Sequence, residues 1–122
     1  MTSLVPAPIT LKNIPVMVSP DPEKPGKYIV VTPGPIPVIT DQDTILSYQI
    51  IDTDGYPIVF KGMSVKPQDN NQLSPATVSL DGKVLAFVDA NTVKMTLNVT
   101  LKFTDKDGVE FSHDPQVDND PQ

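Results

Sequence analysis

The most regular pattern along the chain is an alternation of apolar and polar side chains in its second half. Over residues 94–104, apolar residues occupy every second position, and polar or charged residues lie between them. A period of two residues predicts a β-strand with one buried face and one solvated face. Because antiparallel sheets commonly expose one face to water, this segment predicts an antiparallel sheet.

Asp-Gly pairs interrupt the same half of the chain at Asp54-Gly55, Asp81-Gly82 and Asp107-Gly108. An Asp-Gly pair between two strand-like segments is a strong signal for a β-hairpin. Residues that lie opposite each other in a hairpin share a face, so the apolar pattern selects the loop length.

For the last pair, the pattern favours a three-residue loop over residues 106–108 that ends on a left-handed glycine. This loop places Phe103 opposite Phe111 and Leu101 opposite His113. Both members of each pair then lie on the face that is expected to be inward.

The pair Asp54-Gly55 also predicts a three-residue hairpin loop. A loop over residues 53–55 would pair Ile50 with Ile58 and Tyr48 with Phe60. The middle pair is ambiguous, because a two-residue and a three-residue loop both leave plausible apolar pairs.

Further strands are expected over residues 9–18, 27–32, 44–51, 56–61, 77–80 and 83–88. The apolar pattern of the first strand changes phase at Asn13-Ile14, next to Pro15. Proline cannot donate to a strand ladder, so this strand is expected at an edge, with a bulge or a switch between sheets.

Frequent turns, about seven or eight short strands and no helical pattern predict an all-β protein. The expected fold is a single antiparallel β-sandwich, immunoglobulin-like in architecture, over residues 1–113. A small barrel is the alternative, but strands with a wet face and prolines at edges favour the sandwich. Residues 114–122 are expected to form an acidic, proline-containing tail.

Composition narrows the functional classes. The 122-residue chain has no cysteine, which excludes disulfides, thiolate metal sites and a cysteine nucleophile. Its net charge of −6 with no arginine argues against nucleic-acid binding, which needs a basic face. Nine of its 14 prolines lie in the first 37 residues, where segments 19–26 and 33–37 are expected to be stiff connectors.

The chain shows no pattern for export or for membrane insertion. Its first 18 residues contain one lysine and three prolines and lack the form of a signal peptide. No apolar stretch approaches the length of a membrane-spanning helix. We therefore expect a cytoplasmic protein with no membrane partner.

Carboxylates at two of the turns raise the possibility of Ca²⁺ binding. Asp52 and Asp54 precede Gly55, and Asp105 and Asp107 precede Gly108. Ca²⁺ takes several oxygen ligands, but neither turn has the spacing of an EF-hand loop. Turn formation by Asp and Gly explains both sequences without a metal, and we favour it.

The single histidine, His113, is followed by Asp114, and such a pair can form half of a catalytic unit. Ser112 points to the opposite face, so no nucleophile accompanies the histidine. A histidine at the end of a strand more often packs or forms a structural hydrogen bond. We therefore expect no enzymatic activity, no catalytic residue and no cofactor.

The end of the chain supplies the candidate binding residues, which are His113, Asp114, Pro115, Asp118, Asp120 and Pro121. This segment could add a strand to a partner, or remain an acidic, solvated end. Its composition favours the solvated end. Tyr28 and Tyr56 are the aromatic residues left over for a sugar-binding platform.

Several short segments resemble the DP-EP family, a group of small bacterial proteins named after an Asp-Pro/Glu-Pro type of ending. They are Leu46-Ser47-Tyr48-Gln49-Ile50-Ile51-Asp52, Ile58-Val59-Phe60-Lys61-Gly62, Val78-Ser79-Leu80-Asp81-Gly82 and Asp114-Pro115-Gln116-Val117-Asp118-Asn119-Asp120-Pro121. The resemblance covers residues 44–122. It implies a small bacterial β protein and supplies no catalytic residues.

These observations together favour a non-enzymatic interaction or self-assembly module that uses a sheet edge or the acidic tail. Its partner would be a second copy of the chain or another protein. The alternative is a ligand-binding module that holds Ca²⁺ or a carbohydrate in loops at one end of the sandwich.

Overall fold

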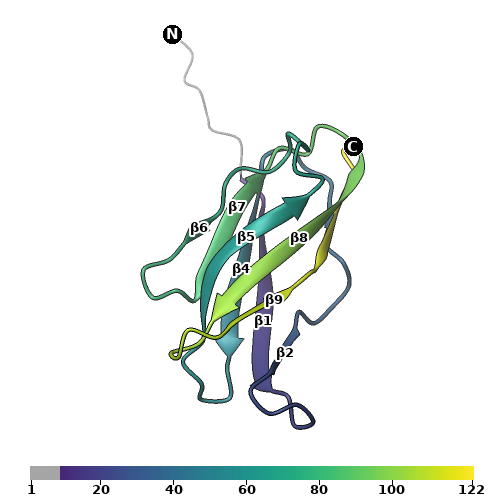
Figure 1. The fold of residues 1–122 in the computed structure, drawn as a ribbon. Coiled ribbons are helices and arrows are strands. Elements are labelled where there is room, and N and C mark those ends of the chain that lie inside the picture. Colours follow the sequence, from purple (N-terminus) through teal and green to yellow (C-terminus); the bar gives the residue numbers. More distant parts are fainter. Residues whose placement is uncertain (1–8) are drawn as a thin grey trace.

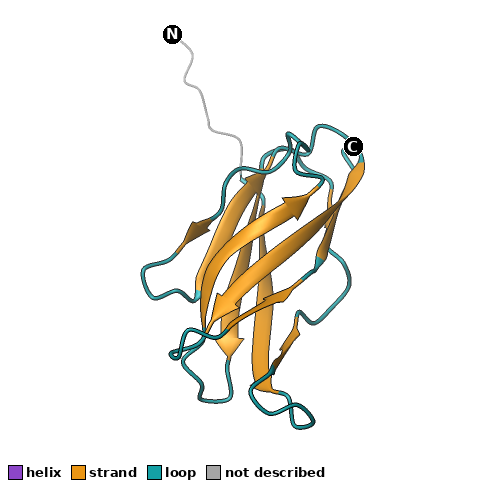
Figure 2. Cartoon of the chain, in the orientation of Figure 1, coloured by secondary structure: helices purple, strands orange, loops and turns teal. Residues whose placement is uncertain are grey.

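A computed structural model of the chain describes residues 9–122, and these residues form an all-β structure of two sheets that face each other (Figures 1 and 2). The expectations for residues 1–8 lie outside the described part. The ten strands are β1 Leu11–Pro20, β2 Tyr28–Val31, β3 Val38–Ile39, β4 Thr44–Asp52, β5 Val59–Lys66, β6 Thr77–Val78, β7 Val84–Asp89, β8 Met95–Thr104, β9 Glu110–His113 and β10 Gln116–Asn119.

The first sheet has the order β2-β1-β4-β7-β6, and the second has the order β3-β10-β8-β5, with β9 also paired to β8. Both sheets end in edge strands and are mixed. β1 runs parallel to β4, and β3 runs parallel to β10. The expectation of a purely antiparallel sheet is therefore wrong, as is the count of seven or eight strands, which missed β3 and β10.

The core lies between the sheets and is dominated by β8. Its alternating residues Leu97, Val99, Leu101 and Phe103 are all fully buried, as the two-residue period predicts. Facing side chains from the other sheet complete the core, including Val16, Leu46, Tyr48, Leu85 and Phe87.

β1 changes partner part-way along its length. Residues 11–17 pair with β4, residues 17–20 pair with β2, and the register shifts between Val16 and Met17. The sequence predicted an irregularity three residues earlier, at Asn13-Ile14. Residues 11–16 of β1 thus have a strand on one side only, among the residues that the structure describes.

The last hairpin is confirmed in register. Phe103 lies opposite Phe111 and Leu101 lies opposite His113. Gly108 has a φ of 79°, which is the left-handed conformation expected for the end of this loop.

The predicted hairpin around Asp54-Gly55 is wrong. Tyr48 lies opposite Leu85 in the first sheet, whereas Phe60 lies opposite Phe103 in the second. The turn is present, because the Tyr56 N–H donates to the Thr53 carbonyl at 3.1 Å, but it carries the chain from one sheet to the other. Strands that face each other across a core have the same apolar pattern as strands of one hairpin, so the pattern did not distinguish the two arrangements.

The segment expected to be a solvated tail is part of the second sheet. β10 pairs with β8 on one side and with β3 on the other, and Val117 is fully buried. The division of the chain at residue 113 therefore does not match its structure. One apolar side chain suffices here because the strand is short and both of its edges are hydrogen-bonded.

The β6–β7 hairpin contacts β5 at Gly82, which leads to a stability prediction. A Cβ atom at this glycine would lie 2.6 Å from Val59 Cβ, and its φ is 75°. Gly82→Ala adds a steric clash of about 1–3 kcal/mol to a left-handed strain of about 1–2 kcal/mol. Gly55→Ala is the matched control, since its φ is 81° and its surroundings are open.

Urea unfolding of both variants checks this prediction. We expect Gly82→Ala to lose clearly more stability than Gly55→Ala. Equal losses for the two variants would contradict the close contact between the hairpin and β5.

Candidate functional site

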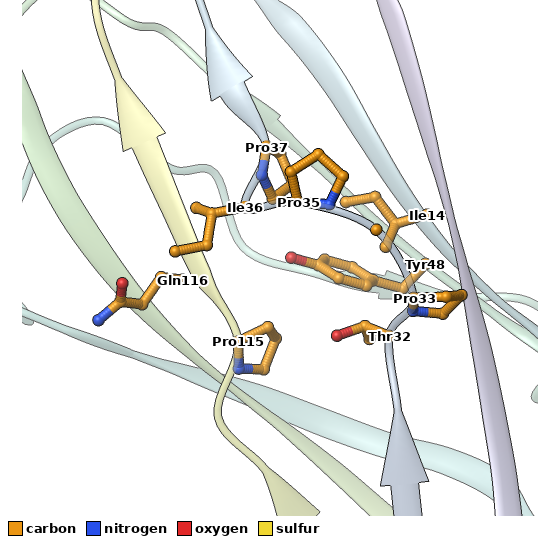
Figure 3. A pocket seen from close by; sticks show the side chains of 10 residues that line it. Ile14, Thr32, Pro33, Pro35, Ile36, Pro37, Tyr48, Pro115 and Gln116 are labelled. Carbon is orange, nitrogen blue, oxygen red and sulfur yellow. The ribbon is translucent and has the colours of Figure 1, made fainter.

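A small cavity lies between the two sheets at the side of the molecule that the β2–β3 connection covers. Its volume is about 180 Å³. Figure 3 shows its walls, which are Ile14, Thr32, Pro33, Gly34, Pro35, Ile36, Pro37, Tyr48, Pro115 and Gln116. We call residues 33–37 the proline loop. The cavity thus joins β1 and β4 of the first sheet to the start of β10 in the second.

Tyr48 supplies the polar group at the centre of these walls. Its side chain extends from β4 between the proline loop and Pro115, with the hydroxyl at its tip (Figure 3). The residue is fully buried, and its hydroxyl has no hydrogen-bond partner. Burial raises the pKa of Tyr48 well above its usual range, so the hydroxyl keeps its proton and is a donor.

The proline loop can form few backbone hydrogen bonds with the rest of the structure. Prolines cannot donate backbone hydrogen bonds. Among the described residues, a backbone hydrogen bond holds the end of the loop: the Asp118 N–H donates to the Pro37 carbonyl at 2.9 Å. The loop therefore covers Tyr48 mainly by apolar contact.

His113 lies next to this cavity through Thr32. The Thr32 hydroxyl and His113 Nε2 are 3.3 Å apart. Burial lowers the pKa of His113, and the nearby Asp114 carboxylate opposes that effect. Because the lowered pKa favours the uncharged form, the imidazole is neutral at pH 7, and its observed polar contact is with the Thr32 hydroxyl.

A second hollow lies beside the proline loop. It has a volume of about 440 Å³ and shares Ile14, three prolines and Ile36 with the cavity. Lys12, Asn13, Pro15 and Val38 complete it. Ile36 and Val38 are nearly half exposed, so this hollow presents apolar surface beside the unpaired part of β1.

The carboxylates considered for Ca²⁺ lie in the two turns, where Asp52 and Asp105 accept from backbone N–H groups. Asp52 Oδ1 accepts from the Asp54 N–H at 2.9 Å, and Asp105 Oδ1 accepts from the Asp107 and Val109 N–H groups. Among the described residues, no three His, Cys, Asp or Glu side chains gather in a group that could hold a metal ion. These contacts are those of turn formation.

The two candidate platform tyrosines belong to an aromatic cluster. Tyr28 stacks on Phe111 at 4.7 Å and contacts Tyr56 edge-on at 6.0 Å between ring centroids. The Tyr28 hydroxyl donates to Asp105 Oδ2 at 2.9 Å. Tyr28 thus links the last hairpin to β2, and Tyr56 remains the more exposed ring.

The candidate residues at the end of the chain separate into different environments. Pro115 lines the cavity, whereas Asp114 is exposed and Pro121 is half-buried. The Asp118 carboxylate accepts from the Thr96 hydroxyl at 2.8 Å, and Asp120 lies 3.9 Å from the Lys94 ammonium.

Sequence reasoning missed the site because it treated Tyr48 only as a core residue and the proline loop only as a connector. One signal was available. A tyrosine at a buried position normally has a partner for its hydroxyl, so a tyrosine within an apolar strand pattern raises the question of where that partner lies.

Removal of the unpartnered hydroxyl gives a stability prediction. An unsatisfied buried polar group costs about 1–3 kcal/mol, so Tyr48→Phe should leave the free energy of unfolding unchanged or raise it. Tyr28→Phe is the control, because it loses a hydroxyl that has a partner. Urea unfolding of both variants compares them, and a loss in Tyr48→Phe as large as that in Tyr28→Phe would contradict the missing partner.

No helix in residues 9–122 is long and apolar enough to cross a membrane. Comparison with curated proteins finds no match. Comparison with protein families matches residues 8–121, nearly the whole chain, to the DP-EP family. The match extends the resemblance of residues 44–122 to the first half, including the strand and the proline loop that form the cavity. The chain therefore belongs to the DP-EP family.

Proposed function

We propose that this protein is a non-enzymatic binding module for a small, neutral, mostly apolar molecule that carries one hydrogen-bond acceptor. The observation that supports this function is the fully buried Tyr48 hydroxyl, which points among the walls of the cavity without a partner. A buried donor of this kind gains free energy from any acceptor that reaches it.

The size of the cavity limits the ligand. A dry apolar cavity of about 150 Å³ holds one benzene molecule. A cavity of about 180 Å³ therefore suits a single ring with one small polar substituent. The ligand would enter by displacing the proline loop, since that loop covers the hydroxyl.

The chemistry of the walls limits the charge and polarity of the ligand. None of the ten lining residues is charged, and five are proline or isoleucine residues of the loop and β1. Transfer of an ion into such a site is costly. A sugar ring carries hydroxyl groups around most of its edge and would place several of them against the proline and isoleucine side chains, so the carbohydrate alternative has less support than an apolar ring.

Binding of cyclohexanone tests the proposal, with methylcyclohexane as the matched molecule that lacks an acceptor. Nitrogen–proton correlation spectra of the labelled full chain should show shifts at Ile14, Ile36 and Gln116 on addition of the ketone. One hydrogen bond is worth roughly 1 kcal/mol, so Tyr48→Phe should weaken ketone binding by about fivefold and leave methylcyclohexane binding unchanged.

Tyr28→Phe serves as the control and should bind both molecules as the wild type does. An absence of shifts in the wild type up to the solubility of the ketone would contradict the proposed site. Equal ketone affinity of Tyr48→Phe and wild type would contradict the role of the hydroxyl.

A second candidate function is self-association, which the unpaired part of β1 favours. Residues 11–16 pair with β4 alone among the described strands, and Leu11, Ile36 and Val38 expose apolar surface near this edge. A free strand edge can accept a strand of another chain, and a second copy would bury these side chains. We also propose that the architecture is immunoglobulin-like, and the two facing sheets support this.

Light scattering over a range of concentrations tests self-association. We expect a dimer for the wild type and a monomer for Leu11→Lys combined with Ile36→Lys, because both substitutions place charge at the contact. Leu80→Lys should remain dimeric, since Leu80 is fully exposed on the β6–β7 hairpin. A monomeric wild type, or a dimeric double variant, would contradict this function.

A further inference from the structure

Four polar side chains are buried together where β7, β10 and two connections meet, away from the proline loop. They are Gln72, Asp89, Asn91 and Asn119, and each is at most 5% exposed. They come from the β5–β6 connection, the end of β7, the β7–β8 connection and β10. Segments far apart in the sequence therefore bring these groups to one place.

Asp89 is at the centre of this cluster. Its Oδ1 accepts from the Asn91 backbone N–H at 3.0 Å and from Asn119 Nδ2 at 2.9 Å. The Gln72 side-chain oxygen accepts from the Thr92 N–H at 2.7 Å and also faces Asn119 Nδ2 at 3.5 Å. The carboxylate is thus contacted by one side-chain amide and one backbone N–H, while Asn91 Nδ2 donates to the Ile39 and Asp41 carbonyls at 2.9 and 3.1 Å.

Three oxygens of the cluster have no partner, namely Asp89 Oδ2, Asn91 Oδ1 and Asn119 Oδ1. All three are acceptors, and buried acceptors without donors are rare in proteins. A cation is a group that several oxygens of this kind can bind at once.

The charge of the cluster also favours a bound cation. The ion pairs in the described residues join Lys61 to Glu110 and Lys94 to Asp120, and neither involves Asp89. A buried carboxylate is normally paired with a cation.

We propose that Asp89, Asn91 and Asn119 form a Ca²⁺ site, with Asp89 Oδ2 and the two amide oxygens as ligands. Ca²⁺ binds carboxylate and amide oxygens with variable geometry, and its remaining positions can be filled by water or carbonyl groups. This site is separate from the cavity of the proposed function and from the turns that contain Asp52 and Asp105.

An acidic hollow lies on the surface beside Asn119. A hollow of about 370 Å³ is lined by Asn119 together with Asp118, Asp120 and Lys94. Lys94 is held by Asp120, and Asp118 accepts from Thr96, so the hollow carries more negative than positive charge. A site with one carboxylate binds Ca²⁺ weakly, with a dissociation constant of about 0.1–1 mM.

Thermal unfolding of the metal-free full chain tests the site, with CaCl₂ added at constant ionic strength. A ligand that binds only the folded state raises the midpoint, and 10 mM Ca²⁺ should raise it by about 5 °C or more. Asp89→Asn preserves the shape of the side chain, removes the charge and should abolish this shift. Asp105→Asn changes a turn carboxylate and should retain it.

Asn119→Asp adds a second carboxylate to the proposed ligands. Without Ca²⁺ it should unfold at a lower temperature than the wild type, and its Ca²⁺-induced shift should be larger. Should that variant not fold, the side-chain amide resonances of Asn91 and Asn119 in the wild type remain a direct readout. They should move on addition of Ca²⁺, with half the change at about 0.1–1 mM.

Two results would overturn the proposal. One is a wild type whose midpoint and amide resonances do not respond to Ca²⁺, which would show that a proton or water satisfies Asp89. The other is a Ca²⁺-induced shift that persists in Asp89→Asn, which would place the ion elsewhere. Neither result depends on the cyclohexanone experiment.

Discussion

Burial of one face of β8 is the interaction on which the rest of the structure depends. Its four inward side chains are fully buried, and each contributes about 1.5–3 kcal/mol when it is removed from water. The same strand pairs with β5 along one edge and with β9 and β10 along the other. Both the hydrophobic core and the hydrogen bonding of the second sheet therefore require β8.

Polar chemistry lies where this regular packing stops. On one side of the molecule the β2–β3 connection crosses between the sheets, and its prolines leave a cavity around the Tyr48 hydroxyl. At the end of β7, the carboxylate of Asp89 is buried and accepts from the Asn91 N–H and from Asn119 Nδ2. β10 contributes to both places, through Pro115 before it and Asn119 at its end. The C-terminal segment thus connects the two proposed sites to the core.

Particular residues show how far the sequence could predict these features. The register of Phe103 with Phe111 followed from the alternation and from the turn, since both are local properties of the chain. His113 was placed correctly opposite Leu101 for the same reason, but its contact with Thr32 joins residues 81 positions apart. The cluster around Asp89 escaped notice because no short motif contains its members.

The sequence by itself determined the all-β class, the positions of most strands, the last hairpin and the family. These features depend on which side chains are apolar and on where the backbone turns, and short segments of the sequence determine both. Only the tertiary structure decided that β1 pairs parallel to β4, that β4 and β5 lie in different sheets, and that residues 116–119 form a strand. The physical reason is that every free strand edge offers the same N–H and C=O groups, so the choice of partner depends on the packing of the whole core.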